Sequence, residues 1–162
     1  MTLKDFLAQF GNTLKEIISK RNVPTYDPMN EGPWEEAVRE RLNTLKRTPF
    51  PKQAETVLAL LKGFKKDGTK GLFLTAEMGT GKTLMAIAVS FILCPPKSRT
   101  LVMCPGHLVR KWIREIEETI PHARAVNLNG PGLAELFELR RTAPTGREFY
   151  IIGKERAKNH YA

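Results

Sequence analysis

The feature that most limits the fold of this chain is a glycine-containing loop between an apolar stretch and an alanine-rich stretch. Residues 71–75 are mostly apolar, residues 76–81 include Gly79 and Gly81, and residues 84–89 have a helical pattern. Glycine can adopt positive φ and has no Cβ, so such a loop can turn successive backbone N–H groups inward. The order predicts a strand, a tight loop and a helix, which is the setting of an anion-binding loop.

Residues 76–83 match the phosphate-binding pattern in which Gly-Lys-Thr closes the loop, with Ala76 where the strict pattern has glycine. The helix that follows directs its positive N-terminal end at the same place. Lys82 can reach the β- and γ-phosphates, and the Thr83 hydroxyl can enter the coordination shell of Mg²⁺. We therefore predict a site for ATP and Mg²⁺ that uses Met78, Gly79, Thr80, Gly81, Lys82, Thr83 and Leu84.

Length and composition are those of a globular protein with one core. The chain has 162 residues, of which 41% are hydrophobic and 27% are charged, enough for one domain and a small appendage. No apolar run is long enough to cross a membrane, and the charged residues near the N-terminus argue against a signal peptide. We expect an intracellular protein, in the cytoplasm, nucleoid or nucleus, with no membrane partner.

Cys94 and Cys104 are the only cysteines, and both lie in apolar surroundings. Neither belongs to a closely spaced pair, and the three histidines show no metal-binding spacing. We predict two buried, reduced packing residues.

Positive charge is concentrated in the part of the chain that contains the phosphate loop. The formal net charge is +9, and residues 1–48 hold eight basic and seven acidic residues. The remaining residues therefore carry most of the excess. This distribution suits a polyanionic partner as well as solubility, and charge alone does not separate the two.

The first 46 residues are predicted to form a helical accessory segment. Residues 3–20 have apolar positions in steps of three and four, with Thr2 and Asp5 as a capping box and a potential break at Gly11. Residues 22–33 contain three prolines and form a linker, and a second helix begins at Pro33. Its apolar face is Trp34, Ala37, Val38, Leu42 and Leu45. This segment shows no chemistry of its own and is expected to dock on a protein surface, either in cis or in trans.

Residues 47–162 have the order of an α/β domain. A proline turn at 48–53 leads into a helix whose apolar face is Val57, Leu58, Leu61 and Phe64. After the loop helix, strands are expected at 99–104, 123–128 and 148–153, and helices at 108–116 and 133–141. Repeated strand–helix order predicts a parallel sheet with helices on both faces.

Four segments in this order resemble a known family: residues 49–53, 76–83, 101–112 and 149–156. Together they look like the first RecA-like domain of a superfamily 2 helicase, closest to the Swi/Snf branch of DNA-dependent ATPases. The resemblance covers roughly residues 47–158. It implies a P-loop NTPase fold, incomplete here, that binds ATP and Mg²⁺ and acts on nucleic acid.

The resemblance also assigns roles to single residues. Gln53 matches the glutamine that reads the adenine edge, with Phe50 near the base. Pro105, Gly106 and His107 match motif Ia, where a strand end and a helix N-terminus meet the nucleic-acid backbone. At motif Ib the family has Thr-Ser-Tyr-Glu and this chain has Gly-Lys-Glu-Arg, so the expected phosphate contacts there are Lys154 and Arg156.

The family's Asp-Glu box, which holds Mg²⁺ and orients water, has no counterpart after Thr83. Motif III and the second RecA-like domain with its arginine fingers are absent as well. We therefore expect the N-terminal part of a motor on nucleic acid, with double-stranded DNA as the expected partner, that is inactive by itself. The alternatives are a non-catalytic nucleotide-binding or partner-recruiting module, and a P-loop ATPase of another group such as an AAA+ protein.

Overall fold

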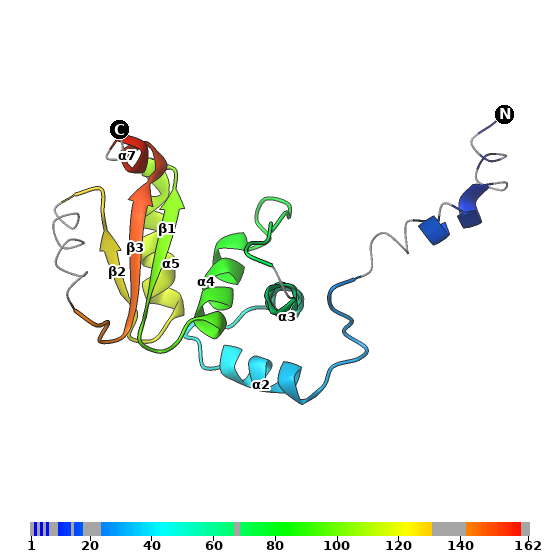
Figure 1. Cartoon of the computed structure of the whole chain (residues 1–162), viewed down its shortest axis with the longest axis horizontal. Helices are drawn as coiled ribbons and strands as arrows, with labels where there is room; N and C mark the ends of the chain where they lie inside the picture. The colour runs from blue at the N-terminus through cyan, green and yellow to red at the C-terminus, as the bar shows by residue number, and fades with distance from the viewer. Residues whose placement is uncertain are drawn as a thin grey trace.

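The computed structural model describes residues 24–66, 69–130 and 142–159, together with residues 2, 4, 6, 10–13 and 15–17. Its longer helices are α2 (Pro33–Leu42), α3 (Pro51–Lys65), α4 (Lys82–Leu93) and α5 (Val109–Thr119). A short 3₁₀ helix, η1 (Gly106–Leu108), precedes α5, and α7 (Lys154–Asn159) follows the last strand. Figure 1 shows two neighbouring parts, a sheet backed by α5 and a group of helices formed by α2, α3 and α4.

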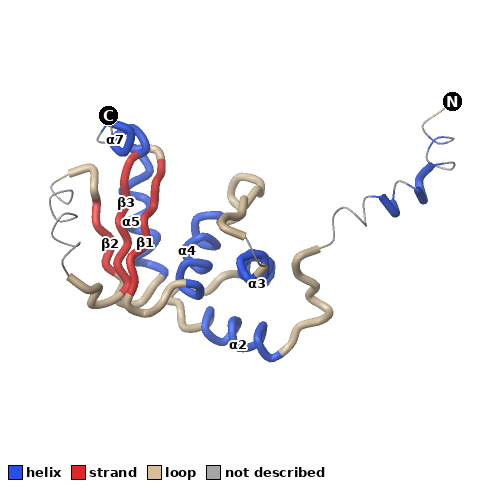
Figure 2. Tube along the Cα trace, in the orientation of Figure 1, coloured by secondary structure: helices blue, strands red, loops and turns tan. Residues whose placement is uncertain are grey.

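The sheet has three parallel strands, β1 (Ser98–Cys104), β2 (Arg124–Asn127) and β3 (Arg147–Gly153), in the order β1-β3-β2. Figure 2 shows the three strands running side by side. These are the three strands predicted from residues 99–104, 123–128 and 148–153. The α/β class and the parallel sheet are therefore confirmed.

The central strand β3 is buried along nearly its whole length. Phe149 and Ile151 belong to the main core, which also contains Ile116 of α5. On the opposite face, Tyr150 and Ile152 pack with an apolar cluster that includes Ala157 of α7. Side chains of a strand alternate between the two faces, so β3 contributes to both clusters.

The sequence predicted that β1 is a buried strand, but one of its faces is largely exposed. Leu101 and Met103 pair in register with Tyr150 and Ile152 and so lie on the same face, yet they are 62% and 60% exposed. β1 is an edge strand, and none of the described elements covers this part of its surface.

Helices α2 and α3 pack on α4 and form the second half of the main core. The expected apolar faces are buried at Val38, Leu42, Val57, Leu58 and Leu61. The C-terminal end of α4 is held by two arginines: Arg41 of α2 donates to the Phe91 carbonyl oxygen at 3.2 Å, and Arg147 of β3 donates to that of Cys94 at 3.0 Å.

The strand predicted at 71–75 does not form, which corrects the sequence interpretation. Residues 69–81 contain no strand, and the Phe73 side chain is 98% exposed. The segment runs along α3, where Leu72 and Leu74 line a small cavity together with Thr56 and Leu60. No strand in the described part of the chain lies beside it, so its backbone has no partner for a β-ladder.

The predicted proline-rich linker is partly fixed to the helices. Tyr26 and Arg39 both hydrogen bond to Glu31, and Lys62 of α3 lies over the Tyr26 ring and forms an ion pair with Glu35 at 2.5 Å. Hydrogen bonding from Arg39 and Tyr26 lowers the pKa of Glu31 to about 2. Residues 24–32 therefore follow a defined path onto α2 and α3.

Near the N-terminus, residues 10–13 are helical, so the chain does not break at Gly11 as the sequence suggested. The helix predicted at 133–141 lies outside the described residues. Among the described helices, none is long and apolar enough to cross a membrane.

The fold makes a prediction about the central strand. Ile151→Ala removes a fully buried side chain and should lower the free energy of unfolding by about 2–5 kcal/mol. Leu101→Ala on the neighbouring edge strand is the matched control and should cost less than about 1 kcal/mol. Urea denaturation followed by circular dichroism measures both, and equal losses would contradict the central position of β3.

Candidate nucleotide and nucleic-acid sites

The phosphate loop has the backbone that the sequence predicted. Gly79 and Gly81 both have positive φ, 84° and 86°. Gly81 is the N-cap of α4, and Met85 N–H donates to its carbonyl oxygen at 3.0 Å. The N–H groups of Lys82, Thr83 and Leu84 are in the first turn of the helix, where they have no intrahelical acceptor. They are therefore available to an anion at this helix end.

Two side chains brace the loop from inside. Lys82 Nζ donates to the carbonyl oxygens of Ala76 and Glu77 at 2.8 and 2.7 Å, and Thr80 Oγ1 donates to Glu77 O at 2.8 Å. The Lys82 ammonium therefore lies inside the loop, hydrogen bonded to two backbone carbonyl oxygens. A phosphate group can replace these acceptors because it offers charge-assisted hydrogen bonds to the same ammonium.

Gln53 lies directly against the loop, although 29 residues separate it from Lys82 in sequence. Its Oε1 accepts from Phe50 N–H at 2.9 Å, and its Nε2 donates to Thr80 O at 3.0 Å. The primary amide keeps one further donor and one further acceptor site, which is what recognition of an adenine edge requires. Phe50 beside it is 74% exposed. Gln53, Thr80 and Thr56 also line a cavity of about 250 Å³ between α3 and the loop.

These residues fit a nucleotide with Mg²⁺. The positive-φ glycines, the free N–H groups at the start of α4 and the Lys82 ammonium form one donor set for phosphate oxygens. The Thr83 hydroxyl makes no hydrogen bond within the described part of the chain, so it remains a potential oxygen ligand. Met78 is almost fully exposed on the outer side of the loop and offers its backbone.

The residues expected to contact nucleic acid meet at the carboxyl edge of the sheet. Pro105, Gly106 and His107 follow β1, while Lys154 and Arg156 are exposed in the first turns of α7 after β3. A Cβ on Gly153 would lie 3.2 Å from Gly106 Cα, so the two strand ends are in close contact. Lys154 Nζ lies 3.8 Å from Glu155 Oε1, a loose and exposed pair.

Cys104 is buried at this edge, as predicted, whereas Cys94 is only partly buried. Burial, and secondarily the charge of Glu155, raise the pKa of the Cys104 thiol, so it remains protonated. His107 is exposed in η1. Figure 1 shows the phosphate loop at the upper end of α4 and α7 above the upper ends of β1 and β3, so both candidate sites lie at the same end of the molecule.

Comparison with known proteins identifies the family. A family model described as the SNF2-related domain matches residues 42–146, more than half of the chain. The chain belongs to the SNF2-related family. The resemblance to Swi/Snf ATPases seen in the sequence is thereby confirmed, and this family implies a P-loop NTPase fold of which the parallel sheet and α4 are parts.

Several known proteins match over about half of this chain. Human DNA repair and recombination protein RAD54B is 33% identical over 85 residues, 46% of this chain and 9% of that protein. The zebrafish (Danio rerio) DNA excision repair protein ERCC-6-like is 30% identical over 80 residues, 48% and 6% respectively. Protein CHROMATIN REMODELING 19 of Arabidopsis thaliana is 33% identical over 87 residues, 52% and 11% respectively. The matched regions are therefore about a tenth or less of these relatives' lengths.

Sequence reasoning missed one residue of the carboxyl edge, Asn129. Its Oδ1 accepts from Gly153 N–H at 2.8 Å, and its own N–H donates to Asn127 Oδ1 at 2.9 Å. A Cβ on Gly153 would lie 3.0 Å from Asn129 Nδ2, so a side chain at position 153 would displace the Asn129 amide. Asn129 fixes the end of β3, and with it Lys154, relative to β2. A polar residue directly after the predicted strand 123–128 was the available signal.

The contact between Gln53 and the loop can be tested by a double-mutant cycle. Gly79→Ala should cost about 1–2 kcal/mol because alanine is strained at positive φ, with no atom near its Cβ. Gly81→Ala should cost more, because its Cβ would also meet Gln53 Nε2 at 2.3 Å. Adding Gln53→Ala should restore part of the Gly81→Ala loss and none of the Gly79→Ala loss.

Thermal unfolding of the wild type and the five variants, including Gln53→Ala alone, supplies the cycle. If the stability losses of Gly81→Ala and Gln53→Ala are strictly additive, the Gln53 amide does not contact the loop at residue 81.

Proposed function

We propose that this chain is the ATP-binding portion of an SNF2-related motor that couples ATP hydrolysis to movement along, or remodelling of, double-stranded DNA. The observation that carries the proposal is the positive-φ loop at the start of α4 with Gln53 hydrogen bonded to it. The loop supplies phosphate donors, and Gln53 supplies an adenine-reading amide at the side of the same loop.

Each residue of the site has a proposed role in binding ATP with Mg²⁺. The N–H groups from Met78 to Leu84 hold the phosphates, and Lys82 leaves its carbonyl acceptors for the β- and γ-phosphate oxygens. Thr83 gives its hydroxyl to the metal, and Gln53 pairs with the adenine edge. The bound Mg²⁺ would supply charge neutralisation for phosphoryl transfer. Lys82 and Thr83 are thus the two residues proposed to contact the reacting groups.

DNA would bind through its backbone at the carboxyl edge. Gly106 and His107 offer backbone N–H groups in η1, and Lys154 and Arg156 offer charge next to them. Contacts of this kind position a duplex without reading its sequence. The names of the relatives, which refer to DNA repair, recombination and chromatin remodelling, support DNA as the substrate and a nuclear or nucleoid location inside the cell.

Hydrolysis requires further groups, and we infer that they come from other segments of the full protein. The described residues contain no cluster of three metal-ligating side chains. Carboxylates for Mg²⁺ and water, and arginine fingers from a second RecA-like domain, would complete the site. The present residues should therefore bind nucleotide and hydrolyse it very slowly. Residues 1–46 are proposed to contact a protein partner as an accessory segment.

Nucleotide binding tests the proposal directly. Lys82→Ala should weaken binding of a fluorescent ATP analogue in the presence of Mg²⁺ by about tenfold or more, the scale expected for losing a charge-assisted phosphate contact. Lys70→Ala, a change of an exposed lysine outside the loop, is the control and should leave the affinity unchanged. Identical affinities for wild type and Lys82→Ala would instead favour a non-catalytic module whose loop is structural.

DNA binding should depend on salt in a way that identifies the contacts. Lys154→Ala and Arg156→Ala should each reduce the slope of log K against log salt concentration by about one, because each would lose one phosphate contact. Lys97→Ala is the matched control, since Lys97 is an exposed lysine just before the start of β1, at the opposite edge of the sheet. An equal reduction for Lys97→Ala would reject the carboxyl edge as the interface.

A further inference from the structure

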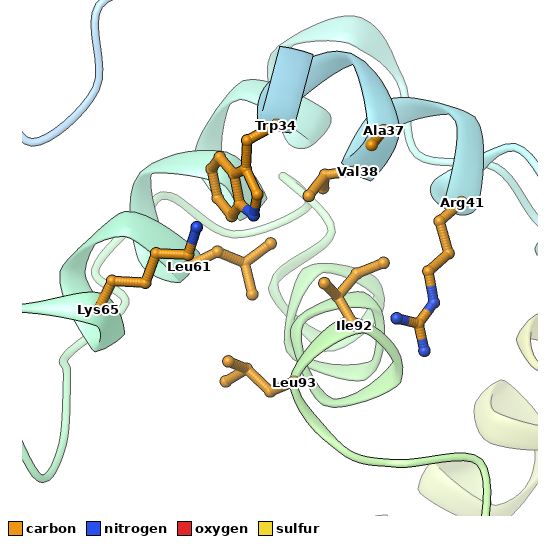
Figure 3. A pocket seen from close by; sticks show the side chains of 8 residues that line it. All are labelled: Trp34, Ala37, Val38, Arg41, Leu61, Lys65, Ile92 and Leu93. Atoms are coloured by element: carbon orange, nitrogen blue, oxygen red, sulfur yellow. The ribbon is translucent and has the colours of Figure 1, made fainter. Parts of the chain in front are cut away.

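A groove lies between α2, α3 and the C-terminal end of α4, at the end of α4 remote from the phosphate loop. Trp34, Val38, Arg41, Leu61, Lys65 and Leu93 line most of it, and we name it the Trp34 groove. Figure 3 shows these apolar side chains between Lys65 on one side and Arg41 on the other. Its volume is about 350 Å³. This is at the small end of the range of about 300–1,000 Å³ for ligand pockets, so it suits one or two side chains.

The charge of the groove is one-sided. Both ionisable side chains that line it are cations, and none of its lining residues is acidic. Neighbouring cations on the same helices do have carboxylate partners: Arg39 pairs with Glu31, and Lys62 pairs with Glu35. Within the described part of the chain, Arg41 and Lys65 have no such partner.

Arg41 and Lys65 are nevertheless held in place. Lys65 Nζ lies 3.4 Å from the centre of the Trp34 ring, and Arg41 donates to Phe91 O while its guanidinium lies 5.3 Å from the Phe91 ring. Arg147 contacts the same ring at 4.5 Å, and burial together with the charge of Arg41 lowers the pKa of Arg147. The cations are thus positioned in advance and add to a local excess of positive charge, which reduces the ordering cost for an anionic partner.

We propose that the Trp34 groove binds an acidic segment of a partner protein, with an apolar side chain of that segment in the groove and its carboxylates on Arg41 and Lys65. Leu93 is 46% exposed at the rim and would be covered by the bound segment. This site is separate from the nucleotide and DNA sites and does not depend on the proposed motor function.

Three other occupants suit the groove less well. A second copy of the chain would bring together molecules that each carry a net charge of +9. The N-terminal segment, residues 1–20, has three lysines and two acidic residues, so it offers no excess of carboxylates to the groove. A nucleic acid would place phosphates against the apolar side chains of Leu61 and Leu93.

A selection of random short peptides displayed on phage, made against the complete chain, tests the proposal. The expected consensus has one or two adjacent apolar residues flanked by aspartates or glutamates. A synthetic peptide with this consensus is then titrated by fluorescence polarisation. Lys65→Glu should weaken its binding by about tenfold or more, because it reverses the charge at the groove.

Lys66→Glu is the matched control, because Lys66 is also exposed, is adjacent in sequence and does not line the groove. It changes the net charge equally and should leave the affinity within about twofold, so general attraction to a basic protein is separated from binding in the groove. Leu93→Ser should weaken binding without a change in net charge.

Three results would overturn the proposal. One is the absence of any enriched acidic–apolar consensus, and another is equal weakening by Lys65→Glu and Lys66→Glu. The third is a dimer by analytical ultracentrifugation that Leu93→Ser dissociates, since it would assign the groove to a second copy of the chain.

Discussion

The rest of the structure depends on which groups interact with the backbone N–H groups at the start of α4 and with the carbonyl oxygens at its end. At its N-terminus the positive-φ Gly81 and the free N–H groups of the first turn face the phosphate loop. At its C-terminus two arginines, one from α2 and one from β3, donate to the last carbonyl oxygens. Cations at this end and an anion at the other both match the direction of the helix dipole. Arg41 comes from the helical part and Arg147 comes from the sheet. Their two hydrogen bonds to the end of α4 therefore also join the helical part to the sheet.

The sheet brings together the carboxyl ends of β1, β2 and β3. Phe149 and Ile151 bind β3 to the main core, and Tyr150 and Ile152 bind it to the second cluster. With β3 buried on both faces, its end at Gly153 is fixed against Gly106 and Asn129. The exposed side chains of Lys154 and Arg156 therefore extend from a part of the backbone that is held in place. In the proposed DNA-binding role, such an edge would position a duplex through its backbone without reading its sequence.

Local patterns could be predicted from the sequence, and contacts between distant segments could not. The glycine loop, the start of α2 at Pro33 and the three strands follow from spacing, proline positions and apolar runs, and all appear in the structure. Asn129 was missed because its role depends on the N–H of Gly153, 24 residues away. The packing of residues 24–32 was missed because prolines suggested a linker, while Tyr26 and Glu31 find partners on α2 and α3.

The unformed strand at 71–75 shows which parts of a nucleotide site depend on the sheet. An apolar segment becomes a strand only when another strand lies beside it, so its state is decided by distant residues. The phosphate loop has no such requirement. Its shape comes from two glycines, from Lys82 and Thr80 bonding to the loop's own carbonyls, and from Gln53 on the adjacent helix. The anion-binding geometry of the loop is therefore present although residues 71–75 pair with no described strand. Pairing of those residues would change how the loop is supported, but it is not needed to give the loop its shape.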